Sequence, residues 1–198
     1  MKFLVFSDTH QDSAKLDILI KRANKKDIDF VIVAGDFTSF ENGLRNTLKK
    51  LNSIKKKIYI IPGNHEEDGN FKGVIKEYPN CINIDCTDFK IENYVFLAYG
   101  GGGFSNLDPQ FRKIARTWYG KYKGKKIVLI THGPAYNCKL DIVDERHVGN
   151  IDYRKFIERI KPKLAICGHI HETAGQSDTI GETKLINPCW DGMVIELN

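Results

Sequence analysis

The chain has 198 residues, of which 41% are hydrophobic and 28% are charged, and its formal net charge at pH 7 is +5. This composition is ordinary for a globular protein and excludes collagen-like and intrinsically disordered chains. The longest apolar runs, such as residues 127–130, are far shorter than the roughly 20 residues needed to cross a bilayer, so we expect no membrane association. The length predicts a single domain over residues 1–198.

Cysteine and lysine usage indicate the cellular setting and the partners. The five cysteines form no CxxC pair, and the first residues lack the apolar core of a signal peptide, so we expect reduced thiols and a cytoplasmic protein. Lysine clusters at residues 21–26, 49–57 and 121–126 are interpreted as solvated helix ends and turns. The weaker alternative is a footprint for nucleic acid. The oligomeric state is not indicated.

The first third of the chain alternates between predicted strands and helices. A strand at residues 2–7 precedes a helix that begins at Asp12 or Ser13 and ends near Lys25. A strand at 30–33, a helix at 44–54 and a strand at 58–61 follow. This βαβαβ order predicts a parallel sheet covered by helices.

The rest of the chain is less regular. Strand-like segments lie near residues 82, 89 and 94–99, before a helix at 109–122 and a strand at 127–130. A helix at 151–160 and a strand at 164–167 come next, and the tail is predicted to be a hairpin of strands that ends at 194–196. The later hairpins indicate antiparallel or mixed strands, so we expect an α/β protein with two packed sheets.

Five polar segments each follow a predicted strand directly. They are Asp8-Thr9-His10, Gly35-Asp36, Gly63-Asn64-His65-Glu66, Thr131-His132-Gly133-Pro134 and Gly168-His169-Ile170-His171. Open α/β sheets bind ligands beyond the carboxyl ends of their strands, so these segments should converge on one place. Carboxylate, imidazole and amide oxygen are ligands for divalent metals, and the absence of thiolate argues against a structural zinc site. Each motif alone is a weak signal, but five in this order are specific.

The ordered motifs D-x-H, G-D, G-N-H-E, H-G and G-H-x-H resemble those of the calcineurin-like metallophosphoesterase superfamily over residues 8–171. The resemblance implies a four-layer α-β-β-α sandwich of two mixed sheets flanked by helices. It also implies a two-metal centre in which a metal-bound hydroxide attacks the phosphorus atom of the substrate.

The resemblance further implies seven metal ligands in two sets that share one residue. The first set is Asp8, His10 and His171, the second set is Asn64, His132 and His169, and the bridging residue is Asp36. His65 would act as the catalytic residue that contacts the phosphate or protonates the leaving oxygen. Oxygen and imidazole ligands favour two Mn²⁺ ions, with Fe²⁺, Zn²⁺, Co²⁺ or Ni²⁺ as alternatives.

One departure from the family pattern bears on the substrate. Protein phosphatases of the superfamily continue the second motif as G-D-x-x-D-R-G, whereas residues 35–41 contain no arginine. Small members with a T-H-G-P segment are often phosphodiesterases. The sequence therefore predicts a phosphodiesterase that hydrolyses small phosphodiesters or cyclic nucleotides. The alternatives are a nuclease on polymeric nucleic acid and a non-catalytic scaffold like the retromer subunit of this fold, which lacks key active-site residues that this chain retains.

Further residues could contact the substrate. Asn64 and His147 are candidate substrate-binding residues, although a lone loop histidine is usually a surface residue. Phe104, Tyr136 and Trp190 could stack on a base or pack within the fold. The glycines at 100–103 form a turn or offer backbone N–H groups to a phosphate.

Overall fold

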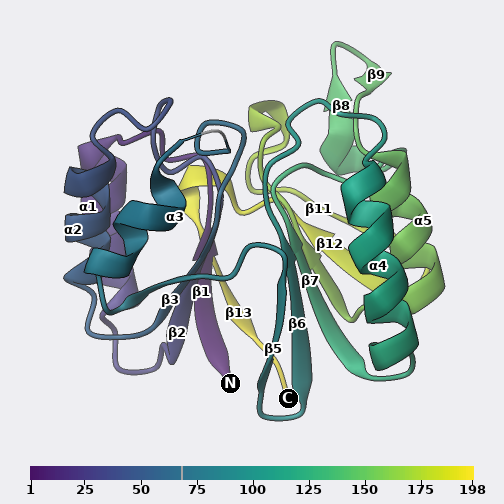
Figure 1. Cartoon of the computed structure of the whole chain (residues 1–198), viewed down its shortest axis with the longest axis horizontal. Coiled ribbons are helices and arrows are strands. Elements are labelled where there is room, and N and C mark those ends of the chain that lie inside the picture. The colour runs from purple at the N-terminus through teal and green to yellow at the C-terminus, as the bar shows by residue number, and fades with distance from the viewer. Residues whose placement is uncertain (68) are drawn as a thin grey trace.

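The computed structural model describes residues 1–67 and 69–198, which form two β-sheets packed face to face with helices on both outer faces (Figure 1). The first sheet has the order β13 (Met193–Glu196), β1 (Lys2–Phe6), β2 (Phe30–Ala34), β3 (Ile58–Ile61) and β4 (Cys81–Asn83). The second has the order β11 (Ser177–Ile180), β12 (Thr183–Ile186), β10 (Leu164–Ile166), β7 (Lys126–Thr131), β6 (Tyr94–Tyr99) and β5 (Thr87–Ile91).

Helices cover both sheets from outside. The first sheet is covered by α1 (Ser13–Ala23), α2 (Leu44–Asn52) and the short α3 (Phe71–Val74), and the second by α4 (Pro109–Tyr122) and α5 (Ile151–Ile160) (Figure 1). The four layers confirm the predicted α-β-β-α sandwich. Helix α1 begins where the Asp12 carboxylate accepts hydrogen bonds from the N–H groups of Ala14 and Lys15, so Asp12 is the cap.

Most neighbouring strands are parallel. Strands β1 to β4 all run in one direction, as the βαβαβ order predicts, and β13 is the antiparallel member of that sheet. In the second sheet β12, β10, β7 and β6 are parallel, and only the edge strands β11 and β5 are antiparallel. Both sheets are therefore mixed, and their parallel strands end beside the same cluster of polar residues.

Three apolar clusters hold the layers together. One lies between the sheets, where Phe3 stacks on Phe30 with ring centroids 4.9 Å apart and meets Phe96 edge-on. The other two lie between each sheet and its helices. Every residue of β2 is buried because that strand has an apolar neighbour on both faces, which explains its continuously apolar sequence.

Three parts of the chain differ from the prediction, and the first is the short helix α3, where no element was predicted. The tail contains the β11–β12 hairpin, but β13 leaves it and pairs with β1 in the other sheet. A small hairpin of β8 (Ile142–Val143) and β9 (Arg146–His147) was not predicted, because strands of two residues carry no measurable periodicity. No helix in residues 1–67 and 69–198 is long and apolar enough to cross a membrane.

Candidate metal centre

The five polar segments meet at the carboxyl ends of the strands that precede them. Two groups of three side chains bring one ligand atom each within 4.8 Å of the others: Asp8 with His10 and His171, and Asp36 with His132 and His169. A third group joins His10, Asp36 and His65. Asp36 thus belongs to two groups, and a cavity of about 300 Å³ opens over them. The predicted convergence is present.

The backbone at these strand ends is strained. Asp8, His10, Asp36 and His169 have φ angles of 53°, 43°, 48° and 69°, in the left-handed region that side-chain-bearing residues seldom adopt. Backbone hydrogen bonds hold the first two in place, because the N–H groups of Asp8 and His10 donate to the carbonyls of Gly35 and Asp36 at 3.1 Å. Strain of this kind is typical of functional sites.

Two glycines allow the segments to approach one another. Gly35 has a φ of 92°, and a Cβ there would lie 2.5 Å from Nδ1 of His132. A Cβ on Gly63 would overlap the Asp36 carboxylate. Gly35 is therefore required by the turn and by close packing, whereas Gly63 is required by close packing alone.

His132 directs its Nε2 at the centre. Its Nδ1 lies 2.9 Å from the carbonyl oxygen of Ala34, which can only accept, so Nδ1 carries a proton. Its Nε2 lies 3.1 Å from Oδ1 of Asn64 and 3.3 Å from Oδ2 of Asp36, and both of these are also acceptors. These two acceptors need a positive charge beside them, which is the Nε2 proton of His132 in the metal-free protein and would be a cation in the metal-bound form.

A second pair of ligand atoms lies equally close. Nε2 of His10 lies 3.2 Å from Nε2 of His171, while Nδ1 of His10 faces the Thr38 carbonyl at 3.3 Å. The Thr38 contact places the proton of His10 on Nδ1, which leaves its Nε2 as an acceptor. Nε2 of His171 also lies 3.7 Å from Oδ1 of Asp8. This group, like the first, is arranged around a positive charge.

The titration of the histidines agrees with this geometry. Burial alone would lower the pKa of His132, but the Asp36 carboxylate outweighs burial and raises that pKa to about 9. Burial, with His132 alongside, lowers the pKa of His169 to about 4. Nε2 of His169 is buried and has no hydrogen-bond partner among the described residues. His169 therefore offers a neutral, unpartnered imidazole nitrogen, which is the form that binds metal.

A divalent cation fits these donors. Two ligands held at right angles by one cation, each about 2.1 Å from it, lie about 3 Å apart. That spacing matches the facing atoms of Asn64 and His132 and those of His10 and His171. A metal-binding protein also fixes each ligating histidine through its other ring nitrogen, as the carbonyls of Ala34 and Thr38 do here.

Glu66 is buried beneath the centre and binds the backbone of two polar segments. The sequence-based prediction assigned it no role. It is 2% exposed, and its carboxylate accepts hydrogen bonds from the N–H groups of Asp36, Gly63 and Thr38 at 2.9–3.0 Å and from the Thr38 hydroxyl at 2.5 Å. Burial and the nearby Asp36 raise the pKa of Glu66 to about 7. It thereby joins the second and third polar segments.

Replacing Glu66 with glutamine should destabilise the fold. The new amide would turn an N–H group toward backbone donors, and leaving a buried donor unsatisfied costs about 1–3 kcal/mol. We expect the free energy of unfolding of the metal-free protein to fall by about that amount, measured by urea denaturation. Glu182→Gln removes the same charge from an exposed turn and should change stability little. Equal stability of the two variants would contradict the role of Glu66.

The remaining predicted residues differ in position. His65 lines the cavity, and its Nδ1 accepts a hydrogen bond from the N–H of Phe40 at 3.2 Å. His147 lies in β9 outside the cavity lining, with its Nδ1 2.7 Å from Oδ1 of Asp141. Phe104 lines the cavity and meets the His169 ring edge-on at 4.3 Å.

Aromatic side chains surround the centre. Trp190 meets the His171 ring edge-on at 5.1 Å, whereas Tyr136 contacts His147 instead. Phe40, which the sequence-based prediction did not single out, is 73% exposed and stacks on His65 with centroids 4.1 Å apart. Its position just after the Gly35-Asp36 motif was the only available signal.

Comparison with known proteins identifies the family of the chain. The family model described as Calcineurin-like phosphoesterase matches residues 1–173. The chain belongs to the calcineurin-like phosphoesterase family. This membership assigns it to the metal-dependent hydrolases of phosphate esters, and it confirms the resemblance seen in the motifs.

Individual proteins share the sequence or the fold of this chain. An uncharacterised protein of Methanocaldococcus jannaschii, MJ1162, is 33% identical over 95% of this chain and 88% of its own length. A probable glycerophosphodiester phosphodiesterase, GpdQ, of Arcobacter nitrofigilis is 25% identical over 74% of this chain and 58% of its own length. The structure of TT1561 from Thermus thermophilus has a TM-score of 0.76 at 13% identity, over 95% of this chain and 88% of that one.

Proposed function

We propose that this calcineurin-like phosphoesterase is a phosphodiesterase that acts on small phosphodiesters or cyclic nucleotides with two divalent cations, Mn²⁺ being the preferred metal. One observation carries the proposal: Asp8 with His10 and His171, and Asp36 with His132 and His169, each bring three ligand atoms within 4.8 Å of one another, and the buried Nε2 of His169 has no hydrogen-bond partner among the described residues. The proposed ligands are Asp8, His10 and His171 for one cation, Asn64, His132 and His169 for the other, and Asp36 for both. A reducing, cytoplasmic setting is part of the same proposal.

The cations would supply a water of lowered pKa and a positive charge beside the phosphoryl oxygens. The protein supplies the rigid arrangement that receives them. Asp36 is held by the N–H of His65, which donates to its Oδ1 at 3.0 Å, and Asp8 is held by the Ser7 hydroxyl and by the N–H of His169 at 3.1 Å. These contacts fix the carboxylates before the substrate arrives, so little reorganisation is needed.

His65 is placed to donate a hydrogen bond to the phosphoryl group. Because its Nδ1 accepts from the Phe40 N–H, the ring proton lies on Nε2, which is 3.8 Å from Oδ2 of Asp36. Transfer of that proton from a neutral ring would leave an imidazolate. Of the two roles that the motif implies, the hydrogen bond to the phosphate is therefore the better supported, and a protonated Nε2 is not a metal ligand.

The preference for diesters is tested with paired substrates. We expect bis(p-nitrophenyl) phosphate to be cleaved faster than p-nitrophenyl phosphate and phosphoserine peptides, because no arginine follows Asp36 to bind the second charge of a monoester. The exposed rings of Phe40 and Phe104 suit the organic groups that a diester carries on both sides. The relation to a probable glycerophosphodiester phosphodiesterase points the same way. Faster cleavage of the phosphopeptides would refute the proposal.

Metal loading should depend on pH. Since the pKa of metal-free His132 is about 9, cation binding there displaces a proton at neutral pH. The apparent affinity should therefore rise about tenfold per pH unit up to that value, and activity should collapse below about pH 6.5 as the cations dissociate. Dialysis against Mn²⁺ followed by elemental analysis should give two ions per chain at pH 8. No more than one ion, or full occupancy at strongly acidic pH, would contradict the ligand assignment.

A further inference from the structure

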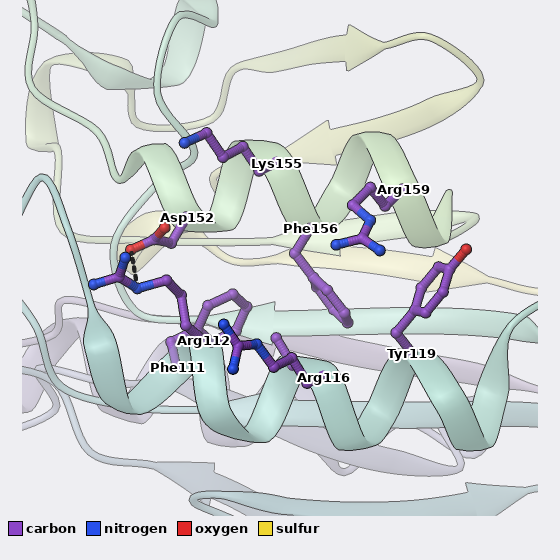
Figure 2. A pocket seen from close by; sticks show the side chains of 9 residues that line it. Phe111, Arg112, Arg116, Tyr119, Asp152, Lys155, Phe156 and Arg159 are labelled. Atoms are coloured by element: carbon purple, nitrogen blue, oxygen red, sulfur yellow. Dashed lines mark ion pairs between the residues drawn. The ribbon is translucent and has the colours of Figure 1, made fainter.

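A second cavity lies far from the metal ligands, between α4 and α5 on the outer face of the second sheet. It has a volume of about 280 Å³, and Phe111, Ala115 and Phe156 form its floor. Figure 2 shows Arg112, Arg116 and Tyr119 on α4 facing Phe156 and Arg159 on α5. None of the residues that line this groove lines the cavity over the metal centre.

The groove lies in the most basic part of the chain. Residues 109–126 contain seven lysines and arginines and no acidic residue. Residues 151–163 contain five lysines and arginines and two acidic residues. The whole chain has 30 basic and 25 acidic residues, and these two segments hold 12 of the basic and two of the acidic ones. The rest of the chain therefore has 18 basic and 23 acidic residues. The positive charge of the protein is therefore concentrated on these two segments, which comprise the two helices and the few residues after each, while the rest of the chain is net negative.

The basic side chains of the groove are incompletely neutralised. Asp152 is the one acidic residue of the groove lining, and its carboxylate is 3.5 Å from Nε of Arg112 and also accepts from the Asp108 N–H. Within residues 1–67 and 69–198, Arg116 and Lys155 form no ion pair and no side-chain hydrogen bond. Both are exposed and available to an anionic ligand.

The two helices present these charges in register. Because α4 and α5 each connect parallel strands on the same face of the sheet, they run in the same direction. Arg116 follows Arg112 by four residues and Arg159 follows Lys155 by four, so each pair is separated by about 6 Å along its helix. Basic residues from both helices therefore border the apolar floor.

We propose that the groove between α4 and α5 binds the phosphate backbone of single-stranded nucleic acid. The basic side chains that line the groove are Lys155 and three arginines, whose planar guanidinium groups form paired hydrogen bonds with phosphate oxygens. The half-buried ring of Tyr119 has the Arg159 guanidinium 4.7 Å and the Lys123 ammonium 5.5 Å from its centroid, so a base would stack on the guanidinium plane that lies over the ring. An acidic peptide would use the charge but has no use for the aromatic face. The groove is independent of the proposed hydrolysis at the metal centre.

The test measures binding without catalysis. A fluorescein-labelled oligothymidine is titrated with the full-length protein in a chelator, which keeps the probe intact, and its anisotropy is recorded over a range of salt concentrations. The wild-type protein should bind, and Arg116→Gln with Lys155→Gln should bind more weakly. The slope of log affinity against log salt should fall by about 1.4, since each phosphate contact on a single strand contributes about 0.7. Arg116→Lys should retain the wild-type slope.

Controls separate the groove from net charge and from folding. Lys55→Gln with Lys57→Gln removes the same charge from exposed positions beside the first sheet and should bind as the wild type does. Retained thermal denaturation of each variant shows that the fold is intact. The proposal is overturned if the wild type does not bind, if both double variants lose the same slope, or if polyglutamate competes as well as unlabelled oligothymidine at equal charge.

Discussion

Replacing His169 with alanine should remove at least one of the two proposed cations and reduce activity to that of the metal-free protein. His169 offers a buried imidazole nitrogen that has no other partner among the described residues, and the low pKa keeps that nitrogen neutral at physiological pH. Its removal takes a ligand from the group that contains Asp36 and His132. Elemental analysis after dialysis against Mn²⁺ gives the metal count, and nitrophenyl and alkyl diesters should both cease to be hydrolysed.

The matched control is His147→Ala. The His147 ring contacts a carboxylate, that of Asp141, but it lies outside the cavity over the metal centre. Its replacement should leave both cations bound. Full metal occupancy in the His169 variant would show that this residue is not a ligand, whatever happens to activity.

Replacing His65 with alanine should separate catalysis from metal binding. We expect both cations to remain and turnover to fall by about 10²–10³-fold, the usual effect of removing one hydrogen-bond donor to a developing negative charge. The factor should be similar for diesters with nitrophenolate and with alkoxide leaving groups, because a hydrogen bond to the phosphoryl oxygens acts on both. Rapid-mixing or steady-state kinetics on the metal-loaded variant gives turnover.

Two further measurements decide between the roles of His65. His65→Gln keeps an N–H donor and should recover part of the lost turnover. A loss that is much larger for poor leaving groups would instead assign proton transfer to His65. Loss of a metal ion from the His65→Ala variant would place His65 among the metal ligands. The distances permit this, because His65 forms a third group of close ligand atoms with His10 and Asp36.

The sequence predicted those elements whose signals are local. The strands at 58–61 and 94–99 and the helices at 109–122 and 151–160 have the same bounds in the structure, because each has a strong apolar pattern and a clear stop. The partner of β13 was not predictable in this way. The residues of β13 alternate between half-exposed and exposed, which fits an edge position in either sheet. Only packing against β1 decides which sheet β13 joins.

The site was predictable to the extent that strand ends define it. The motifs named every residue of the two principal groups that could hold a metal ion, because parallel strands bring their carboxyl ends to one edge. Glu66 was not assigned a role, since its contacts with the backbone of Thr38 and Gly63 depend on the fold of three segments together. Phe40 was missed because an exposed aromatic residue after a motif has no characteristic spacing.

The pairing of β1 with β13 has a consequence for synthesis on the ribosome. β2 can pair with β1 soon after both are made, but the other edge of β1 acquires its native neighbour only when residues 193–196 emerge. Until then the strand that leads into Asp8 and His10 presents unpaired N–H and C=O groups, which are prone to pair with other chains. A nascent chain stalled before β13 should therefore associate with chaperones through this edge, and it should bind divalent cations less tightly than the released protein.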